Sequence, residues 1–215
     1  MTEVVLTSLG VAALAVLLSL PFAVGAAWLL ARGRFRGKVL VDAIVHLPLV
    51  LPPVVTGYGL LLLFSSAGPL GGLGLAFSTA GAAVAAAVVS FPLMVRPLRQ
   101  AFEAIDEGLL VAAASLGAQP RRVFWTIALP LARPGLLAGA VLAFGRSLGE
   151  FGATITFAGG FTGGTRTLPI ALHNALQRPD GDGEALAFAA VSTALALATV
   201  LGGELLSRRQ RAATA

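Results

Sequence analysis

The sequence predicts an all-α, polytopic membrane protein. Of its 215 residues, 57% are hydrophobic and 12% are charged, whereas a typical soluble domain has about 25% charged residues. The apolar residues form long runs, and most basic residues lie in short clusters between these runs. This composition excludes a soluble enzyme. Because the basic residues lie between apolar runs, the net charge of +5 indicates a membrane topology and not nucleic-acid binding.

Five apolar stretches are long enough to cross the hydrocarbon core of a membrane, which takes about 20 residues. They cover residues 4–31, 41–64, 76–95, 135–157 and 185–206. In the second stretch, Pro48, Pro52 and Pro53 remove backbone donors and are expected to break the helix. A membrane accepts such a break where neighbouring protein or water satisfies the freed carbonyls. The segment is therefore either a kinked packing helix or a broken helix beside the translocation path, where Thr56 and Tyr58 would supply hydroxyl groups.

The basic residues predict the orientation of these spans. Twelve of the fifteen Lys and Arg residues lie in segments 32–38, 96–133 and 208–211. With five alternating spans, all three segments fall on one side, and the positive-inside rule makes that side cytoplasmic. We therefore expect a multi-pass protein of the cytoplasmic (inner) membrane, with the N-terminus outside and the C-terminus inside. No basic residue precedes the first apolar run, so we expect that run to be retained and not cleaved as a signal peptide.

The chain lacks the residues that enzymes of the common classes use. It has no cysteine and only two histidines, His46 and His173, so no metal site is expected. Its one lysine, Lys38, is followed by Val39, which excludes a phosphate-binding P-loop. Ser90 and Ser147 have no visible general base beside them, because both histidines lie in other segments. We therefore expect a chain that is not an enzyme and holds no cofactor of its own.

Residues 97–133 form a long cytoplasmic segment between the third and fourth spans. Helical spacing places five apolar residues on one face: Phe102, Ile105, Leu109, Ala112 and Leu116. Gly117 is expected to end this helix, and a second short helix is expected over 121–129. The pattern alone also fits an amphipathic segment that lies on the inner membrane surface.

The spacing within this segment resembles the EAA loop of ABC-importer permeases. Ala112 and Ala113 are followed by three residues, Gly117, nine residues and then Ile127-Ala128-Leu129-Pro130. Val111 stands where the motif has glutamate. The resemblance implies a MetI-like permease fold and a coupling helix that docks on a cytoplasmic ATPase. The residues that it assigns to coupling are Ala112, Ala113, Gly117, Arg121, Arg122, Ile127, Leu129 and Pro130.

Three further runs resemble the molybdate permease family of ABC importers: HLPLVLPPVV (46–55), SFPLMVR (90–96) and RSLGEFGATITF (146–157). The resemblance covers nearly the whole chain, 1–215, as a single transmembrane domain that contains segment 97–133. It implies a homodimer, two cytoplasmic ATPase subunits that bind ATP and Mg, and an oxyanion-binding protein outside the membrane. Tungstate and sulfate permeases share this architecture and remain alternatives.

Arg146, Ser147 and Glu150 lie inside the fourth predicted span, as candidates for a gate or a translocation path. A lone charge there is costly, so the two charged residues should face protein or water. Their spacing allows them to neutralise each other on one helix face, either as a gate for an anion or as a structural ion pair. A second class of transporter, an ion-coupled secondary transporter, would use them as a charge relay. Gly135 with Gly139 and Gly145 with Gly149 in the same span are expected to serve helix packing within the subunit.

Overall fold

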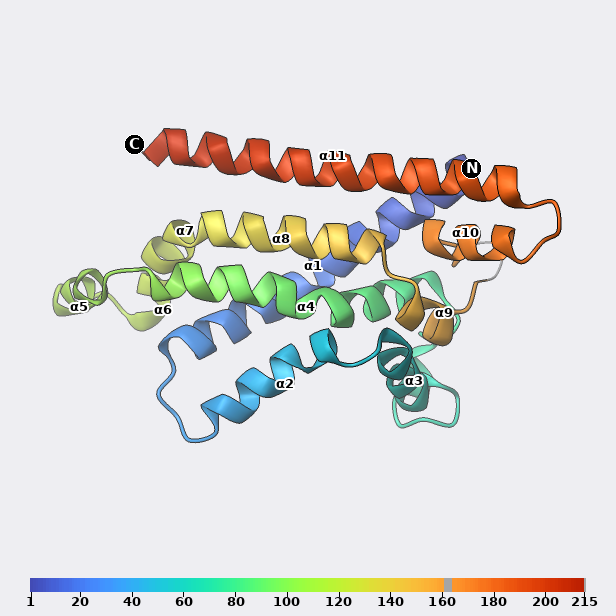
Figure 1. Cartoon of the computed structure of the whole chain (residues 1–215). Helices are drawn as coiled ribbons and strands as arrows, with labels where there is room; N and C mark the ends of the chain where they lie inside the picture. The colour runs from blue at the N-terminus through green and yellow to red at the C-terminus, as the bar shows by residue number, and fades with distance from the viewer. Residues whose placement is uncertain (161–163, 215) are drawn as a thin grey trace.

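The computed structural model describes residues 1–160 and 164–214, and every regular element in these residues is helical. Three helices form the centre of the bundle: α1 (Thr2–Arg32), α4 (Thr79–Glu103) and α8 (Arg133–Leu148). The long C-terminal helix α11 (Asp182–Thr214) runs along one side of the bundle against α8 (Figure 1). The prediction of an all-α fold is confirmed.

Three helices are each long and apolar enough to cross a membrane, namely α1, α4 and the Asp182–Leu206 part of α11. Two pairs of helices pass the same test only when they are joined. One pair is α2 (Lys38–Val50) with α3 (Pro53–Phe64), which is bent by 112°, and the other joins Pro120–Leu131 to α8 through a bend of 66°. The described residues therefore contain three spans, or five if each bent pair crosses the membrane as one.

The central helices pack closely because small residues face one another. A Cβ atom on Gly139 of α8 would lie 2.6 Å from the carbonyl oxygen of Met94 on α4. One on Gly135 would lie 2.6 Å from the carbonyl oxygen of Pro97. Glycine at these two positions allows direct backbone contact between α4 and α8. The expected packing role within the subunit is confirmed for Gly135 and Gly139, and a Cβ on Gly145 would lie 3.4 Å from Thr199 of α11. For Gly149 it is wrong, because this residue lies beyond the end of α8.

The second predicted span breaks more sharply than a kinked helix. Leu51 precedes Pro52 and is extended, as the proline ring requires, and Pro53 begins α3 at the position where its missing N–H costs nothing. Pro48 lies inside the last turn of α2 and does not end it. The break was thus correctly predicted at Pro52 and Pro53 and wrongly at Pro48.

The fourth predicted span is wrong as a single helix over 135–157. Helix α8 ends at Leu148, and a separate helix α9 (Gly152–Ala158) follows. Its sixteen residues give α8 a length of about 24 Å. The break has a physical cause, because the carboxylate of Glu150 accepts a hydrogen bond from the backbone N–H of Ala153 and so caps α9 instead of continuing α8.

The outer segment 164–181 leads into α11 and is partly helical. It contains helix α10 (Leu168–Leu176), with Leu168, Ala171 and Ala175 buried against α1 and α11. Residues 161–163 lie outside the described residues. A one-turn helix, η1 (Gly71–Leu73), lies in the connection between α3 and α4.

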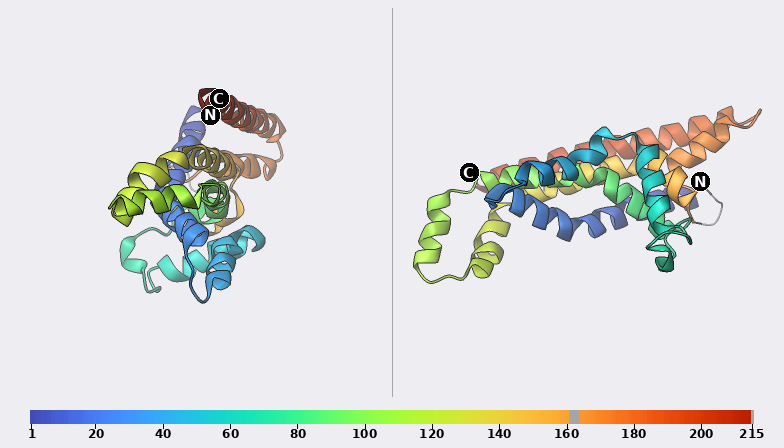
Figure 2. Two further views of the ribbon diagram at one scale, coloured as in Figure 1. Left: turned by 90° about the vertical axis from the view of Figure 1, so that its left-hand side faces the viewer. Right: turned by 90° about the horizontal axis from the view of Figure 1, so that it is seen from below.

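The basic segments gather at one end of the bundle. Figure 1 shows the C-terminus, the α1–α2 connection and the segment after α4 at the same end, with α3, α9 and α10 at the opposite end. Figure 2 shows that the segment after α4 projects beyond the bundle at this end. The three segments therefore lie on one side, as the charge pattern predicts.

Candidate coupling segment and translocation path

The projecting segment begins with a break that the sequence pattern does not reveal. Helix α4 ends at Glu103, and Asp106 caps a new helix, α5 (Glu107–Ser115), by accepting hydrogen bonds from the N–H groups of Gly108 (2.6 Å) and Leu109 (3.3 Å). Phe102 and Ile105 are buried in the core of the bundle. The predicted continuous apolar face from Phe102 to Leu116 is therefore wrong. Because two helices meet there, Phe102 and Ile105 belong to the core, whereas Leu109 and Ala112 belong to α5 and Leu116 is its C-cap.

The end of α5 is formed by glycine, as predicted. Gly117 has φ +83°, in the left-handed region where residues with a Cβ are strained. Its N–H donates to the carbonyl of Ala114 (2.9 Å), and the N–H of Ala118 donates to the carbonyl of Ala113 (3.1 Å). This pair of bonds is a Schellman motif, which satisfies carbonyls at the helix end and reverses the chain direction.

The return half of the segment consists of α6 (Pro120–Val123), a π-helical stretch η2 (Phe124–Ala128) and α7 (Leu129–Leu131). Phe124 faces the bundle, with its ring 5.1 Å from that of Trp28 on α1 and 6.1 Å from that of Phe102 on α4. Trp125 on the neighbouring position is exposed. The expected second helix is therefore present, and one aromatic side chain attaches it to the bundle.

The coupling residues of the sequence analysis divide into an exposed and a partly covered group. Ala112, Gly117, Arg121 and Arg122 are exposed, and neither guanidinium forms an ion pair with any described residue. Those that are half-buried are Ala113, Ile127, Leu129 and Pro130. On α5, Val111 is 58% exposed, so an apolar side chain faces outward where the motif has glutamate.

Arg146 and Glu150 meet as the sequence predicts, although Glu150 lies beyond the end of α8. An ion pair of 2.7 Å joins Nη1 of Arg146 to Oε2 of Glu150, whose side chain is 2% exposed. The other carboxylate oxygen accepts the N–H of Ala153 at 2.9 Å. The buried carboxylate therefore has both a counter-charge and a backbone donor, as a buried charge requires.

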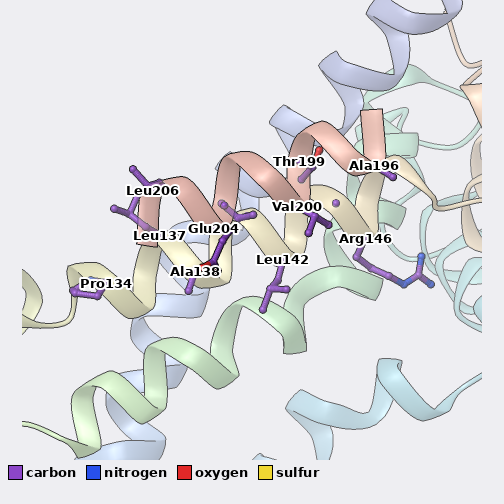
Figure 3. Close-up of a pocket in the computed structure, with 13 residues that line it drawn as sticks. Pro134, Leu137, Ala138, Leu142, Arg146, Ala196, Thr199, Val200, Glu204 and Leu206 are labelled. Atoms are coloured by element: carbon purple, nitrogen blue, oxygen red, sulfur yellow. The ribbon is translucent and has the colours of Figure 1, made fainter. Parts of the chain in front are cut away.

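Ser147 points toward α4 and not toward this ion pair. Its hydroxyl donates to that of Ser90 at 3.2 Å, and both side chains are buried. Figure 3 shows Arg146 at one end of a groove between α8 and α11, with its guanidinium directed away from the groove. That groove has a volume of about 490 Å³ and is lined mostly by apolar side chains.

Thr56 and Tyr58 follow the break between α2 and α3. Thr56 has a buried hydroxyl oxygen with no partner among the described residues, whereas Tyr58 is exposed. Helix α3 lies directly against α9, because a Cβ on Gly57 would stand 2.6 Å from the carbonyl oxygen of Ala153. The structure thus joins the α2–α3 break to the α8–α9 break, and it leaves Tyr58 outside this contact.

Two groups of polar contacts were missed by sequence reasoning. Arg99 on α4 bonds to Asp42 on α2 (2.9 Å) and to Glu103 (2.8 Å), and His46 lies 3.1 Å from Asp42. The i, i+4 spacings of Arg99 with Glu103 and of Asp42 with His46 were a visible signal, but their joining across two helices was not. The partner of His46 is Asp42, through both its carboxylate and its backbone oxygen.

The second group of missed contacts is formed by Arg32, the last residue of α1. Its Nη2 atom donates to the carbonyl oxygens of Phe102 (2.8 Å) and Ile105 (2.6 Å), on either side of the end of α4. The sequence pattern counted Arg32 only as a topology signal. Its partners are backbone atoms, so no sequence motif could have identified the contact.

The bundle thus has candidate membrane spans, two helix breaks and a segment that projects at one end. Residues 6–212 match the family described as "Binding-protein-dependent transport system inner membrane component", and the chain belongs to this family. It is a permease subunit of an ABC transporter and not in itself an enzyme. The family implies ATPase and binding-protein partners and a location in the membrane.

Named relatives are more specific. The chain is 52% identical, over 97% of its length and 94% of the relative, to the molybdenum transport system permease protein ModB of Escherichia coli K12. It is 48% identical to the ModB protein of Haemophilus influenzae, over 95% of this chain and 92% of that one. It is also 38% identical to a probable sulfate transport system permease protein, cysT, of Chlorokybus atmophyticus, over 75% of this chain and 59% of that one.

Two solved structures of similar fold are ABC transporters. A bacterial importer of the acidic polysaccharide alginate matches with a TM-score of 0.72 and 20% identity, over 97% of this chain and 79% of that one. An amino acid ABC transporter matches with a TM-score of 0.65 and 20% identity, over 97% and 92%. The predicted ABC-importer permease fold is confirmed.

Proposed function

We propose that this chain is the permease subunit through which an ATP-driven importer carries molybdate across the cytoplasmic membrane. The observation that carries the proposal is 52% identity, over nearly the whole chain, to a permease named for molybdenum transport. The relative named for sulfate transport is 38% identical over three quarters of the chain, which makes sulfate the second candidate. Tungstate, which is close to molybdate in charge and shape, is the third.

The projecting segment is the proposed contact with the ATPase. Helix α5 has no buried residue, and Ala112, Arg121 and Arg122 are open to a partner. Gly117 reverses the chain between the two helices of this segment. Two copies of the permease, two ATPase subunits and an external oxyanion-binding protein would form the importer, and ATP and Mg would be bound by the ATPase.

The breaks between α2 and α3 and between α8 and α9 are the proposed elements of the translocation path. They bring Thr56 near the helix that Glu150 caps, and they place the half-exposed Arg146 next to them. Arg146 is already paired with Glu150, so it is a weak binding site for an anion. Selection among oxyanions is therefore assigned mainly to the binding protein.

The test is ATP-dependent uptake by membrane vesicles that contain this chain, its ATPase and its binding protein. Molybdate, tungstate and sulfate are compared both as labelled substrates and as competitors. We expect molybdate uptake that a tenfold excess of sulfate does not reduce. Uptake dominated by sulfate would overturn the substrate and keep the transporter class, whereas uptake that needs an ion gradient and no ATP would favour the secondary transporter.

A further inference from the structure

The last turn of α1 holds both ends of the projecting segment. Trp28 and Arg32 lie four residues apart on α1, which places them on the same face of the helix. Trp28 contacts Phe102, where the chain leaves the bundle, at a ring distance of 5.1 Å, and Phe124, where it returns, also at 5.1 Å. Arg32 binds the chain at the point of departure.

The bonds of Arg32 fix the direction in which α5 leaves α4. The carbonyl of Phe102 belongs to the last turn of α4, and that of Ile105 belongs to the connection that follows. Carbonyls at a helix C-terminus lack intrahelical partners and carry partial negative charge, so a guanidinium is a favourable donor there. Because one nitrogen atom bonds to both oxygens, the connection cannot swing without breaking a charge-assisted bond.

Few other contacts hold this connection. The ion pair between Arg34 and Glu107 is long, at 3.6 Å, and both side chains are largely exposed, so it contributes little. Ala104 and Asp106 are exposed. Without Arg32, the chain between Glu103 and α5 keeps the buried side chains of Phe102 and Ile105 and its backbone bonds to α4, but it loses these hydrogen bonds to α1.

We propose that Arg32 is a positioning residue that attaches the coupling segment to α1, so that movement of the ATPase reaches α1 as well as α4. This inference rests on the proposed function of the segment. It assigns to α1 a part in coupling that the exposed residues of α5 do not reveal. Removal of the attachment would let α5 move on the ATPase without moving the rest of the bundle.

The experiment measures molybdate imported per ATP hydrolysed, in the assembled complex with its binding protein. The variant is R32Q, and the matched control is R36Q, because Arg36 is exposed and forms no ion pair or hydrogen bond with a described residue. We expect R32Q to keep an ATPase rate within about twofold of the unmodified complex and to import at least about threefold less molybdate per ATP. R36Q should keep the full ratio.

A lysine variant guards against misfolding. Lysine keeps the charge, but its ammonium group lies one bond closer to the main chain and cannot reach both carbonyls. The matched control for R32K is R36K. We expect R32K to import an amount of molybdate per ATP that lies between the values of R32Q and R36K. If R32Q does not assemble, the comparison of R32K with R36K decides the question. A ratio equal to that of the matched Arg36 variant overturns the inference, as does a proportional loss of import and ATP hydrolysis. The proposed function is decided by the unmodified complex, so its failure is distinct.

Discussion

Glu150 shows what a charge needs in order to be stable inside this protein. Its carboxylate is almost fully buried, and its stability rests on Arg146 at 2.7 Å and on the N–H of Ala153. Arg146 is partly exposed, so its own charge is less costly than that of its partner. The pair is therefore asymmetric: loss of the arginine leaves a buried anion, whereas loss of the anion leaves a cation that water can reach.

This asymmetry gives a stability prediction. We expect R146Q to lower the free energy of unfolding by about 3 kcal/mol, because it removes the counter-charge of a buried carboxylate. The double variant R146Q/E150Q should regain most of this loss, since glutamine at position 150 can still accept the N–H of Ala153. Thermal unfolding of the purified complex in detergent measures both variants.

Import by the double variant separates the two roles that the sequence left open. Restored stability with restored import indicates a structural ion pair, and restored stability without import indicates a gate. An R146Q complex as stable as the unmodified one would contradict the prediction.

Gly139 gives a second prediction at the scale of one residue. A Cβ at this position would lie 2.6 Å from the backbone oxygen of Met94, and backbone cannot turn aside as a side chain can. We expect G139A to lower the free energy of unfolding by about 1–3 kcal/mol. The matched control is G25A, because a Cβ on Gly25 of α1 meets nothing within 4 Å. Equal melting temperatures for the two variants would show that α4 and α8 separate without cost.

At the scale of elements, the reversal between α5 and α6 depends on the backbone of Gly117. There is open space for a Cβ, so the constraint is the positive φ alone. Asparagine tolerates this conformation and valine does not. We expect G117V to reduce molybdate imported per ATP severalfold, because strain of about 1–2 kcal/mol redirects the helix end, and G117N to retain most of the coupling. Equal ratios for the two variants would contradict a role for this turn.

The breaks in the chain show which elements a sequence can predict. The end of α5 and the break at Pro52 and Pro53 were predictable because glycine and proline act through their own backbone geometry. The α4–α5 break at Ala104 was not, because it depends on a contact with Arg32, which is distant in the sequence. The α8–α9 break at Glu150 was not, because it depends on a side chain that turns back to the backbone. Apolar spacing continues across each of these two breaks, so periodicity alone predicts one helix.

The same distinction applies to the candidate site. Arg146 and Glu150 were found because an intramembrane charge is costly and its partner lay four residues away. Arg32 was missed because its partners are carbonyl oxygens at positions 102 and 105, which no residue type announces. The ion pair between residues four apart left a trace in the sequence, whereas the contacts of Arg32 with the backbone and of Arg99 with Asp42 on another helix did not.

At the scale of the whole molecule, the charge distribution predicts the orientation in the membrane. The segment with α5 lies at the end that carries the basic clusters, and the connection between α10 and α11 lies at the other end (Figure 1). The positive-inside rule therefore places Ser115 in the cytoplasm and Gln177 outside. Both residues are exposed, so each can be labelled if it is replaced by cysteine.

Because the sequence contains no cysteine, a thiol reagent can label only the cysteine that is introduced. We expect a membrane-impermeant maleimide to label Q177C, and not S115C, in right-side-out vesicles, and the pattern to reverse in inside-out vesicles. The unmodified chain, which should take no label in either preparation, is the control. Labelling of S115C from outside would invert the topology. It would also separate α5 from any cytoplasmic ATPase, because the segment that projects from the bundle would then face the wrong compartment.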